Sequence, residues 1–459
     1  MIGFRKLALS QRRALSLSRS STIIGIALSS LVATRPAIGQ QPDAASPPIR
    51  ATAPPAEPEV TLEAILRVAL EKSPDLSEAK ARSQAAKESA PATSRLPDPE
   101  LEYQLWAQPI ARPLALDETQ MHMFGLRQAF PAPGTLGNRG DAATAKADVA
   151  EQGYRARRLD LVARIERAYA AYYLADREYR LHLEHAELTQ KVVDLERAAY
   201  QAGRGTQQDV LRAGLELSRL HNDVVAIQSD RETARGLLNT LMGRPVDAPL
   251  GSPAAIEVDA LRSRARGSAR ASTEKRPEIA AARSAVRAEE SEASASRAAG
   301  KWPSLMVGVQ YMYMPTMADT HNYGVMLSMS LPWFNPRYGE ETRAAEARVT
   351  AERSALRSVQ LAADYQHYAA SQRFEAARKT FATIDADLFP QARRSFEAAQ
   401  ANYRGGQLDS MALLDALRAL LDVRTERERA LANLALAAAD LERATGNSSY
   451  GRDHGAPGK

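Results

Sequence analysis

The sequence predicts a mainly α-helical fold with a small β part, in which long helical hairpins join four strands per chain. Apolar residues at heptad spacing predict the helices, and shorter segments of alternating apolar and polar residues predict the strands. Pro74 and Pro277 are 203 residues apart, as are Tyr200 and Tyr403. Such recurrence indicates a two-fold internal repeat, over 60–253 and 254–446. Each half is expected to contain a helix, two strands and a helical hairpin.

The two ends of the chain are predicted to lie outside this fold. The first 39 residues hold six of the 60 Lys and Arg residues and no acid, with an apolar core inside them. This is typical of a secretory signal peptide over 1–39, and a short membrane anchor is the alternative. Residues 40–59 are rich in Pro and Ala and are interpreted as a linker, and 447–459 as a flexible tail. The basic excess behind the pI of 9.3 lies in the leader, so no nucleic-acid partner is expected.

The long helices are predicted from their apolar spacing. Apolar residues from Leu161 to Tyr179 step by four and three, and those from Val210 to Ile227 step by three and four. This spacing is typical of a coiled-coil seam. A helix over 139–199 would be about 90 Å long at 1.5 Å per residue. The pattern therefore predicts an elongated hairpin, although an extended coiled-coil scaffold would show it as well.

Four segments are predicted to be strands, at about 99–107, 120–130, 304–314 and 323–331. The third is the clearest, because apolar side chains from Leu305 to Tyr313 alternate with smaller or polar ones. A tilted strand that crosses an outer membrane needs about 9–11 residues. Four strands cannot close a barrel around a lumen, and open strand edges are not tolerated in lipid. Several copies are therefore expected to share one barrel, without any membrane-spanning helix.

The two-fold internal repeat and two motifs resemble the TolC family of outer-membrane efflux proteins. One is the strand-to-helix passage Gln128–Arg139, and the other is a helix tip with Tyr-x-x-Gly followed by aspartate and leucine. The resemblance covers about residues 60–446. It implies a homotrimer with a shared β-barrel in the outer membrane of a Gram-negative bacterium and an α-helical tunnel in the periplasm. The implied partners are outer-membrane lipid, a periplasmic adaptor (membrane fusion) protein and an inner-membrane pump of the RND type.

The resemblance also implies roles for residues at the two helix tips. The matching residues are Tyr200, Gly203, Asp209 and Leu211 in the first tip, and Tyr403, Gly406, Leu414 and Asp415 in the second. Asp415 and Tyr403 are expected to form a periplasmic gate, and the other six to contact the adaptor. Core packing of the tyrosines and a solvated Asp415 are the alternatives. Ala412 and Leu408 replace a second aspartate and an arginine of the family, so a weaker closed-state ion-pair network is expected.

Six methionines are predicted to lie on the lumen side of the strands: Met121, Met123, Met306, Met312, Met314 and Met326. Thioether sulfur is a soft ligand that suits Cu(I) and Ag(I), which favours heavy-metal export with weak, sequential contacts. The alternative is that methionine fills irregular apolar space. His182 and His185 are expected to be surface residues. No firm metal site and no cofactor are expected.

Other classes of function find little support in the sequence. The chain has no cysteine, which excludes disulfides, thiolate metal sites and a lipoprotein anchor. It lacks a Walker loop, a dinucleotide fingerprint, a His-Glu-x-x-His pair and a Gly-x-Ser-x-Gly elbow, so no enzyme is expected. The resemblance implies a passive exit duct gated at its helix tips. A duct for drugs or organic solutes, a type I protein secretion duct, and a periplasmic coiled-coil adaptor or scaffold are the alternatives.

Overall fold

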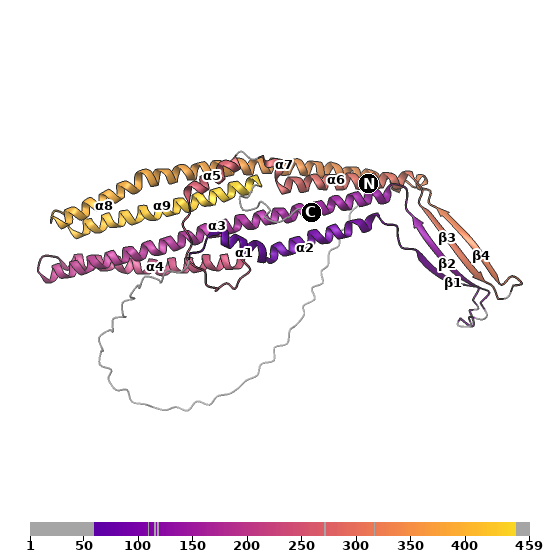
Figure 1. The fold of residues 1–459 in the computed structure, drawn as a ribbon, viewed down its shortest axis with the longest axis horizontal. Helices are drawn as coiled ribbons and strands as arrows, with labels where there is room; N and C mark the ends of the chain where they lie inside the picture. The colour runs from indigo at the N-terminus through magenta and orange to yellow at the C-terminus, as the bar shows by residue number, and fades with distance from the viewer. Residues whose placement is uncertain are drawn as a thin grey trace, which may run out of the picture. The chain divides into compact units, whose positions relative to one another are not determined.

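The computed structural model describes residues 59–446 apart from 109, 114, 115, 117, 118, 270, 271 and 316. The predicted signal peptide over 1–39, the linker up to residue 58 and the tail over 447–459 lie outside the described residues. The described part is mainly helical and contains one four-stranded antiparallel sheet (Figure 1). The predicted balance of helix and strand is therefore confirmed.

The first half of the chain contains four helices and two strands. In order these are α1 (Leu62–Lys72), α2 (Pro74–Ser89), β1 (Glu100–Trp106), β2 (Met121–Phe130), α3 (Thr135–Gln201) and α4 (Gln207–Leu241). A 3-10 turn over Ala90–Ser94 follows α2. Two helices precede the strands where one was predicted, because Pro74 has no N–H group with which to continue α1 and instead begins α2.

The second half has the same order of elements, with one additional break. It contains α5 (Val258–Ala269), α6 (Pro277–Lys301), β3 (Leu305–Tyr313), β4 (His321–Met329), α7 (Arg337–Thr383), α8 (Phe389–Arg404) and α9 (Ser410–Thr445). Short 3-10 turns lie at Thr273–Lys275 and Pro332–Phe334. A π-helical turn over Ile384–Leu388 separates α7 from α8. Pro390 explains this break, since proline lacks an N–H group and clashes with the carbonyl four residues before it.

Helix α3 is continuous over 67 residues, about 100 Å at 1.5 Å per residue. Its predicted apolar seam is buried: Leu161, Ile165, Ala168 and Tyr172 are each at most 4% exposed. It packs against α2, α4, α6 and α9, and Figure 1 shows α3 and α4 side by side as a hairpin. Among the described helices, none is long and apolar enough to cross a membrane.

The sheet has the strand order β1-β2-β3-β4, so its central pair joins one strand from each half. Phe130 lies opposite Leu305 in this pair, and His122 lies opposite Tyr313. The fourth strand lies two residues earlier than the predicted 323–331, since it spans His321–Met329. Pro332 begins the 3-10 turn, and Leu331 before it has already left the extended conformation.

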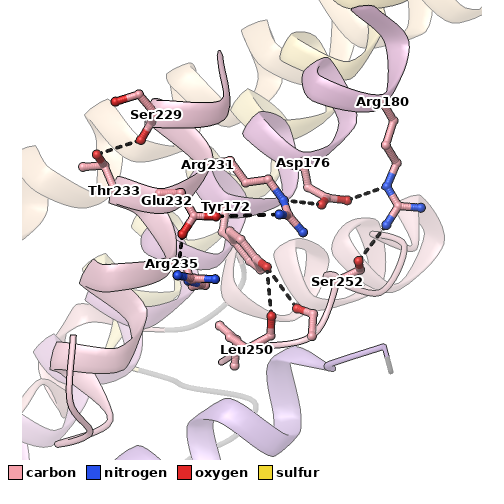
Figure 2. Close-up of polar contacts among 11 residues, drawn as sticks. Tyr172, Asp176, Arg180, Ser229, Arg231, Glu232, Thr233, Arg235, Leu250 and Ser252 are labelled. Atoms are coloured by element: carbon pink, nitrogen blue, oxygen red, sulfur yellow. Dashed lines mark hydrogen bonds and ion pairs between the residues drawn. The ribbon is translucent and has the colours of Figure 1, made fainter. Parts of the chain in front are cut away.

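The segment after α4 is tied to the middle of α3 by partly buried hydrogen bonds (Figure 2). The Tyr172 hydroxyl donates to the carbonyl of Gly251 at 3.0 Å. Asp176 is 2% exposed and accepts hydrogen bonds from Nε of Arg180 at 2.9 Å and Nε of Arg231 at 2.8 Å. The Arg180 Nη2 group also donates to the Ser252 hydroxyl at 2.7 Å. These bonds fix the position of the connection between the two halves.

Candidate functional site

The sheet has one strongly apolar face. Paired residues of neighbouring strands share a face, and successive residues alternate between faces. The register therefore defines an apolar face that contains Leu101, Tyr103, Phe124, Leu126, Val307, Val309, Tyr311, Tyr323, Val325 and Leu327. These side chains are exposed in the isolated chain, reaching 83% for Leu101 and 85% for Tyr323. A contiguous exposed apolar surface of this kind marks an interface with protein or membrane.

Aromatic and histidine rings form rows across the hairpin end of the apolar face. His122, Tyr313 and His321 are neighbours on three successive strands, with ring centroids 5.9 and 5.5 Å apart. The Tyr103 hydroxyl shares a hydrogen bond of 2.9 Å with Nδ1 of His122. Amphipathic rings of this type gather where a membrane protein meets the lipid headgroups. These rows were not predicted from the sequence, because His122 and His321 interrupt the apolar alternation.

The opposite, polar face combines charged side chains with glycine. Arg127 forms ion pairs with Glu100 at 3.3 Å and Glu102 at 3.2 Å. Gln104, Gln310, Asn322 and Ser328 lie on the same face, together with Gly125, Gly308 and Gly324. A sheet with one apolar and one polar face suits a wall between lipid and water.

Five of the six predicted methionines lie on this polar face, namely Met121, Met123, Met306, Met312 and Met326. Met314 differs, because β3 ends at Tyr313 and Met314 lies in the hairpin connection. A Cβ atom added to Gly308 would stand 3.3 Å from Cε of Met326. One added to Gly324 would stand 3.5 Å from Cε of Met312. Methionine methyl groups thus cover glycine positions, which is the contact expected of a gap-filling side chain.

The described residues contain no group of three or more His, Cys, Asp or Glu side chains that could hold a metal ion. The prediction that His182 and His185 are both surface residues is wrong for His185, which is 4% exposed. Burial of its ring lowers the pKa of His185 to about 4. The reason is tertiary, since residues of α4 and α9 such as Glu216 and Arg418 lie around it.

The first helix tip reverses the chain through Gly203. Its φ of +70° is a left-handed conformation that glycine adopts at little cost. The N–H group of Arg204 then bonds to the carbonyl of Ala199 at 2.9 Å, which closes the end of α3. Helix α4 begins with a capping box: N–H of Asp209 donates to the Thr206 hydroxyl at 3.2 Å, and N–H of Thr206 to the Asp209 carboxylate at 3.3 Å. Asp209 therefore has a structural role in the tip.

The second tip repeats this geometry with a different cap. Gly406 has a φ of +71°, and N–H of Gln407 bonds to the carbonyl of Asn402 at 2.9 Å. The Asp409 carboxylate caps α9 by accepting from N–H of Ala412 at 2.8 Å. The capping role of Asp409 was not predicted from the sequence, although the 203-residue offset aligns it with Thr206.

The remaining tip side chains differ in their exposure. Tyr200 and Leu211 are 48% and 64% exposed, so both are accessible to a partner. Leu414 is buried in a cluster with Val192, Val193 and Ala213. This burial does not favour contact with an adaptor, which stays a prediction for Leu414. Tyr403 is half-buried. Its burial is the larger cause of its raised pKa, and the nearby Glu196 carboxylate is the smaller one.

Asp415 is exposed on α9 and borders a cavity of about 150 Å³ between the two hairpins. Arg418, one turn later, donates from Nε to Glu216 of α4 at 3.1 Å. This hydrogen bond is the main reason that the pKa of Arg418 is raised, and Asp415 contributes to the same shift. The structure thus places the predicted gate residue beside a bond between the hairpins.

Further ion pairs connect α3 with α9. Glu184 pairs with Arg424 at 3.0 Å, and Glu178 with Arg429 at 2.6 Å. Exposed pairs of this type are each worth at most about 1 kcal/mol.

Comparisons with known proteins identify the fold. A model of the family described as outer membrane efflux protein matches residues 65–244 and 269–447. A comparison with characterised protein sequences found no significant match. The chain is similar to the crystal structure of the VceC outer membrane protein of Vibrio cholerae, with 18% identity, a TM-score of 0.68, and coverage of 84% of this chain and 96% of VceC.

Two further solved structures have the same fold. The open state of the MtrE outer membrane channel of Neisseria gonorrhoeae has 20% identity, a TM-score of 0.65, and coverage of 84% of this chain and 89% of MtrE. CusC has 18% identity, a TM-score of 0.70, and coverage of 86% of this chain and 94% of CusC. The family match spans most of the chain and agrees with the helical hairpins and the two-faced sheet. The chain therefore belongs to the outer membrane efflux protein family.

Proposed function

We propose that this outer-membrane protein is a passive exit duct formed by three copies of the chain, to which each copy contributes β1–β4 of one shared barrel. The observation that carries the proposal is the two-faced sheet, with its exposed apolar face and its charged, glycine-containing opposite face. Strands β1 and β4 are the outer strands of the sheet. They would pair with neighbouring copies, because lipid does not tolerate open strand edges.

The helices below the barrel would form a periplasmic tunnel from coiled-coil hairpins that repeat over 60–253 and 254–446. The matching glycine turns and capped helix starts at the two tips support the repeat. A periplasmic adaptor would dock at the exposed Tyr200 and Leu211, and an inner-membrane pump of the RND type would drive transport. Asp415 and Tyr403 would form the resting gate. The outer-membrane location does not fit the alternative of a periplasmic adaptor or scaffold.

Copper or silver export remains our proposal for the cargo, based on the five methionines that share the polar face. Drug or organic-solute efflux is the second candidate. Met312 and Met326 pack over glycine positions, and this packing accounts for these two side chains without any contact with metal. Growth of a deletion strain on copper, silver, detergents and dyes separates the two. Replacing Met306, Met312 and Met326 by leucine should reproduce selective copper or silver sensitivity if these sulfurs contact cargo. Normal metal tolerance of that variant would leave the methionines as packing residues.

Planar bilayer recordings test the duct and its gate together. The purified protein should form discrete channels, and Asp415→Ala should raise the resting conductance, because alanine is smaller and widens the constriction that the three Asp415 side chains are proposed to narrow. Asp422→Ala is the matched control, since Asp422 is also exposed on α9 but lies two turns further from the tip. An unchanged conductance in Asp415→Ala would remove Asp415 from the gate, and an absence of channels would contradict the duct itself.

A further inference from the structure

A pocket rich in arginine lies between α3, α8 and α9, away from the sheet and the helix tips. Its volume is about 260 Å³. We call it the arginine pocket, and its lining residues are Arg177, Arg180, Leu181, Glu184, Phe389, Arg424, Arg427 and Glu428. Four guanidinium groups and two carboxylates line it. Two further carboxylates, Asp176 and Asp385, accept from Arg180 and Arg427 just outside the lining, so the cluster as a whole is balanced in formal charge. Neither the duct nor its gate explains this concentration of guanidinium groups.

Both carboxylates of the pocket are already engaged. Glu428 accepts from the Tyr173 hydroxyl at 2.9 Å and from Nη1 of Arg427 at 3.1 Å. Burial and the Glu428 carboxylate raise the pKa of Tyr173 to about 12, so this hydroxyl remains a donor at neutral pH. Glu184 accepts from Nη1 of Arg424 at 3.0 Å. Each guanidinium has five N–H groups, so the four arginines have more donors than these two carboxylates together with Asp176 and Asp385 can accept.

Neighbouring groups fix the arginines in position. The guanidinium of Arg427 lies 5.9 Å from the ring centroid of Phe381 and 5.5 Å from that of Phe389. Its Nε also donates to Asp385 at 2.7 Å, and the π-helical turn that contains Asp385 leads directly into Phe389. Arg177 lies 5.3 Å from the ring centroid of Tyr173. The positive charges are thus held in place before any ligand arrives, which lowers the entropic cost of binding.

Arg180 is held at the other side of the pocket. Figure 2 shows its guanidinium between Asp176 and Ser252. Leu181 and Phe389 add an apolar surface to the lining. The lining therefore combines positioned cations with a hydrophobic wall.

We propose that the arginine pocket binds a small organic dianion. Its phosphate or carboxylate groups would contact the guanidinium groups, whose planar forks match these anions. Its carbon frame would lie against Leu181 and Phe389. Because the pocket is lined by α3, α8 and α9, a bound dianion connects the two helical hairpins beside the π-helical turn. This binding is independent of transport through the duct.

Calorimetric titration of the full-length protein in detergent at low salt tests the proposal, with phenyl phosphate as the probe and phenol as its uncharged counterpart. Phenyl phosphate should bind and phenol should not. Arg177→Gln and Arg424→Gln should each weaken binding at least about tenfold, because each removes a charge-assisted contact. The apparent unfolding temperature of the unaltered protein should rise with phenyl phosphate, since a ligand of the folded state stabilises it.

Arg429→Gln is the matched control. Arg429 lies on α9 two residues beyond Arg427, pairs with Glu178 at 2.6 Å and is not part of the pocket lining. Its replacement should leave binding unchanged. Equal weakening in Arg429→Gln, equal binding of phenol, or no binding of phenyl phosphate to the unaltered protein would overturn the proposal. If the pocket variants fail to fold, the salt dependence of binding to the unaltered protein tests the proposal instead. The affinity for phenyl phosphate should fall as the salt concentration is raised, and an affinity independent of salt would also overturn the proposal.

Discussion

Asp176→Asn tests the buried contact between α3 and α4. The side chain of Asp176 is 3% exposed and that of its partner Arg231 is 13% exposed, so removal of the negative charge leaves a largely buried guanidinium without its main counter-charge. Breaking a buried pair in this way costs about 3–5 kcal/mol. The second partner, Arg180, is 47% exposed, and water would replace most of that bond. We therefore expect the free energy of unfolding to fall by about 2–4 kcal/mol.

Denaturation in detergent followed by circular dichroism measures this loss, and hydrogen exchange locates it. Exchange should accelerate in residues 242–257, because Arg180 and Tyr172 hold this segment against α3. Asp194→Asn is the control, since Asp194 lies on the same helix but its side chain is 59% exposed. Its effect should stay within about 0.5 kcal/mol. Equal stability of the two variants would refute the argument that burial makes the Asp176 bonds strong.

Three further predictions concern other parts of the chain. Burial lowers the pKa of His185 to about 4, so the unfolded chain binds a proton at this residue before the folded chain does as pH falls below about 6.5. The free energy of unfolding should therefore decline by on the order of 3 kcal/mol toward pH 4. Denaturation midpoints of His185→Gln should lack this part of the pH dependence. Asp409→Ala should lower the free energy of unfolding by about 1 kcal/mol, because it removes the side-chain cap of α9, and Asp409→Ser should restore the cap. Equal denaturation midpoints for the unaltered protein and both variants would contradict a capping role of Asp409. Gly308→Ala should destabilise by about 1 kcal/mol through crowding of Met326 and Arg127, and Met326→Ala should relieve it in a double-mutant cycle.

The repeated landmarks and the alternating strands could be predicted because they follow from local patterns. Pro74 and Pro277 each begin a helix, and Gly203 and Gly406 each adopt the left-handed conformation that the tip motif predicts. The faces of the strands also follow from residue alternation alone. For this reason five of the six methionines share one face of the sheet, and their position toward a lumen stays a prediction.

The features that were missed depend on contacts between distant segments. His185 is buried because α4 and α9 pack over it, which no pattern within α3 reveals. Leu414 matches a tip motif but packs against Val192 and Val193. The arginine pocket joins residues more than 200 positions apart, such as Arg177 and Arg424. Single-sequence reasoning treats such residues as solvated helix surface.

The orientation of the sheet in the membrane tests the central claim most directly. The chain has no cysteine, so single cysteines at Val309 and Gln310 can be labelled without a background signal. These neighbours lie on opposite faces of β3. After reconstitution into vesicles, a fluorophore at 309 should be quenched by nitroxide-labelled lipid, and one at 310 by a water-soluble quencher. Quenching of both positions from water, or the reverse pattern, would contradict a barrel with its apolar face toward lipid and its polar face toward the lumen.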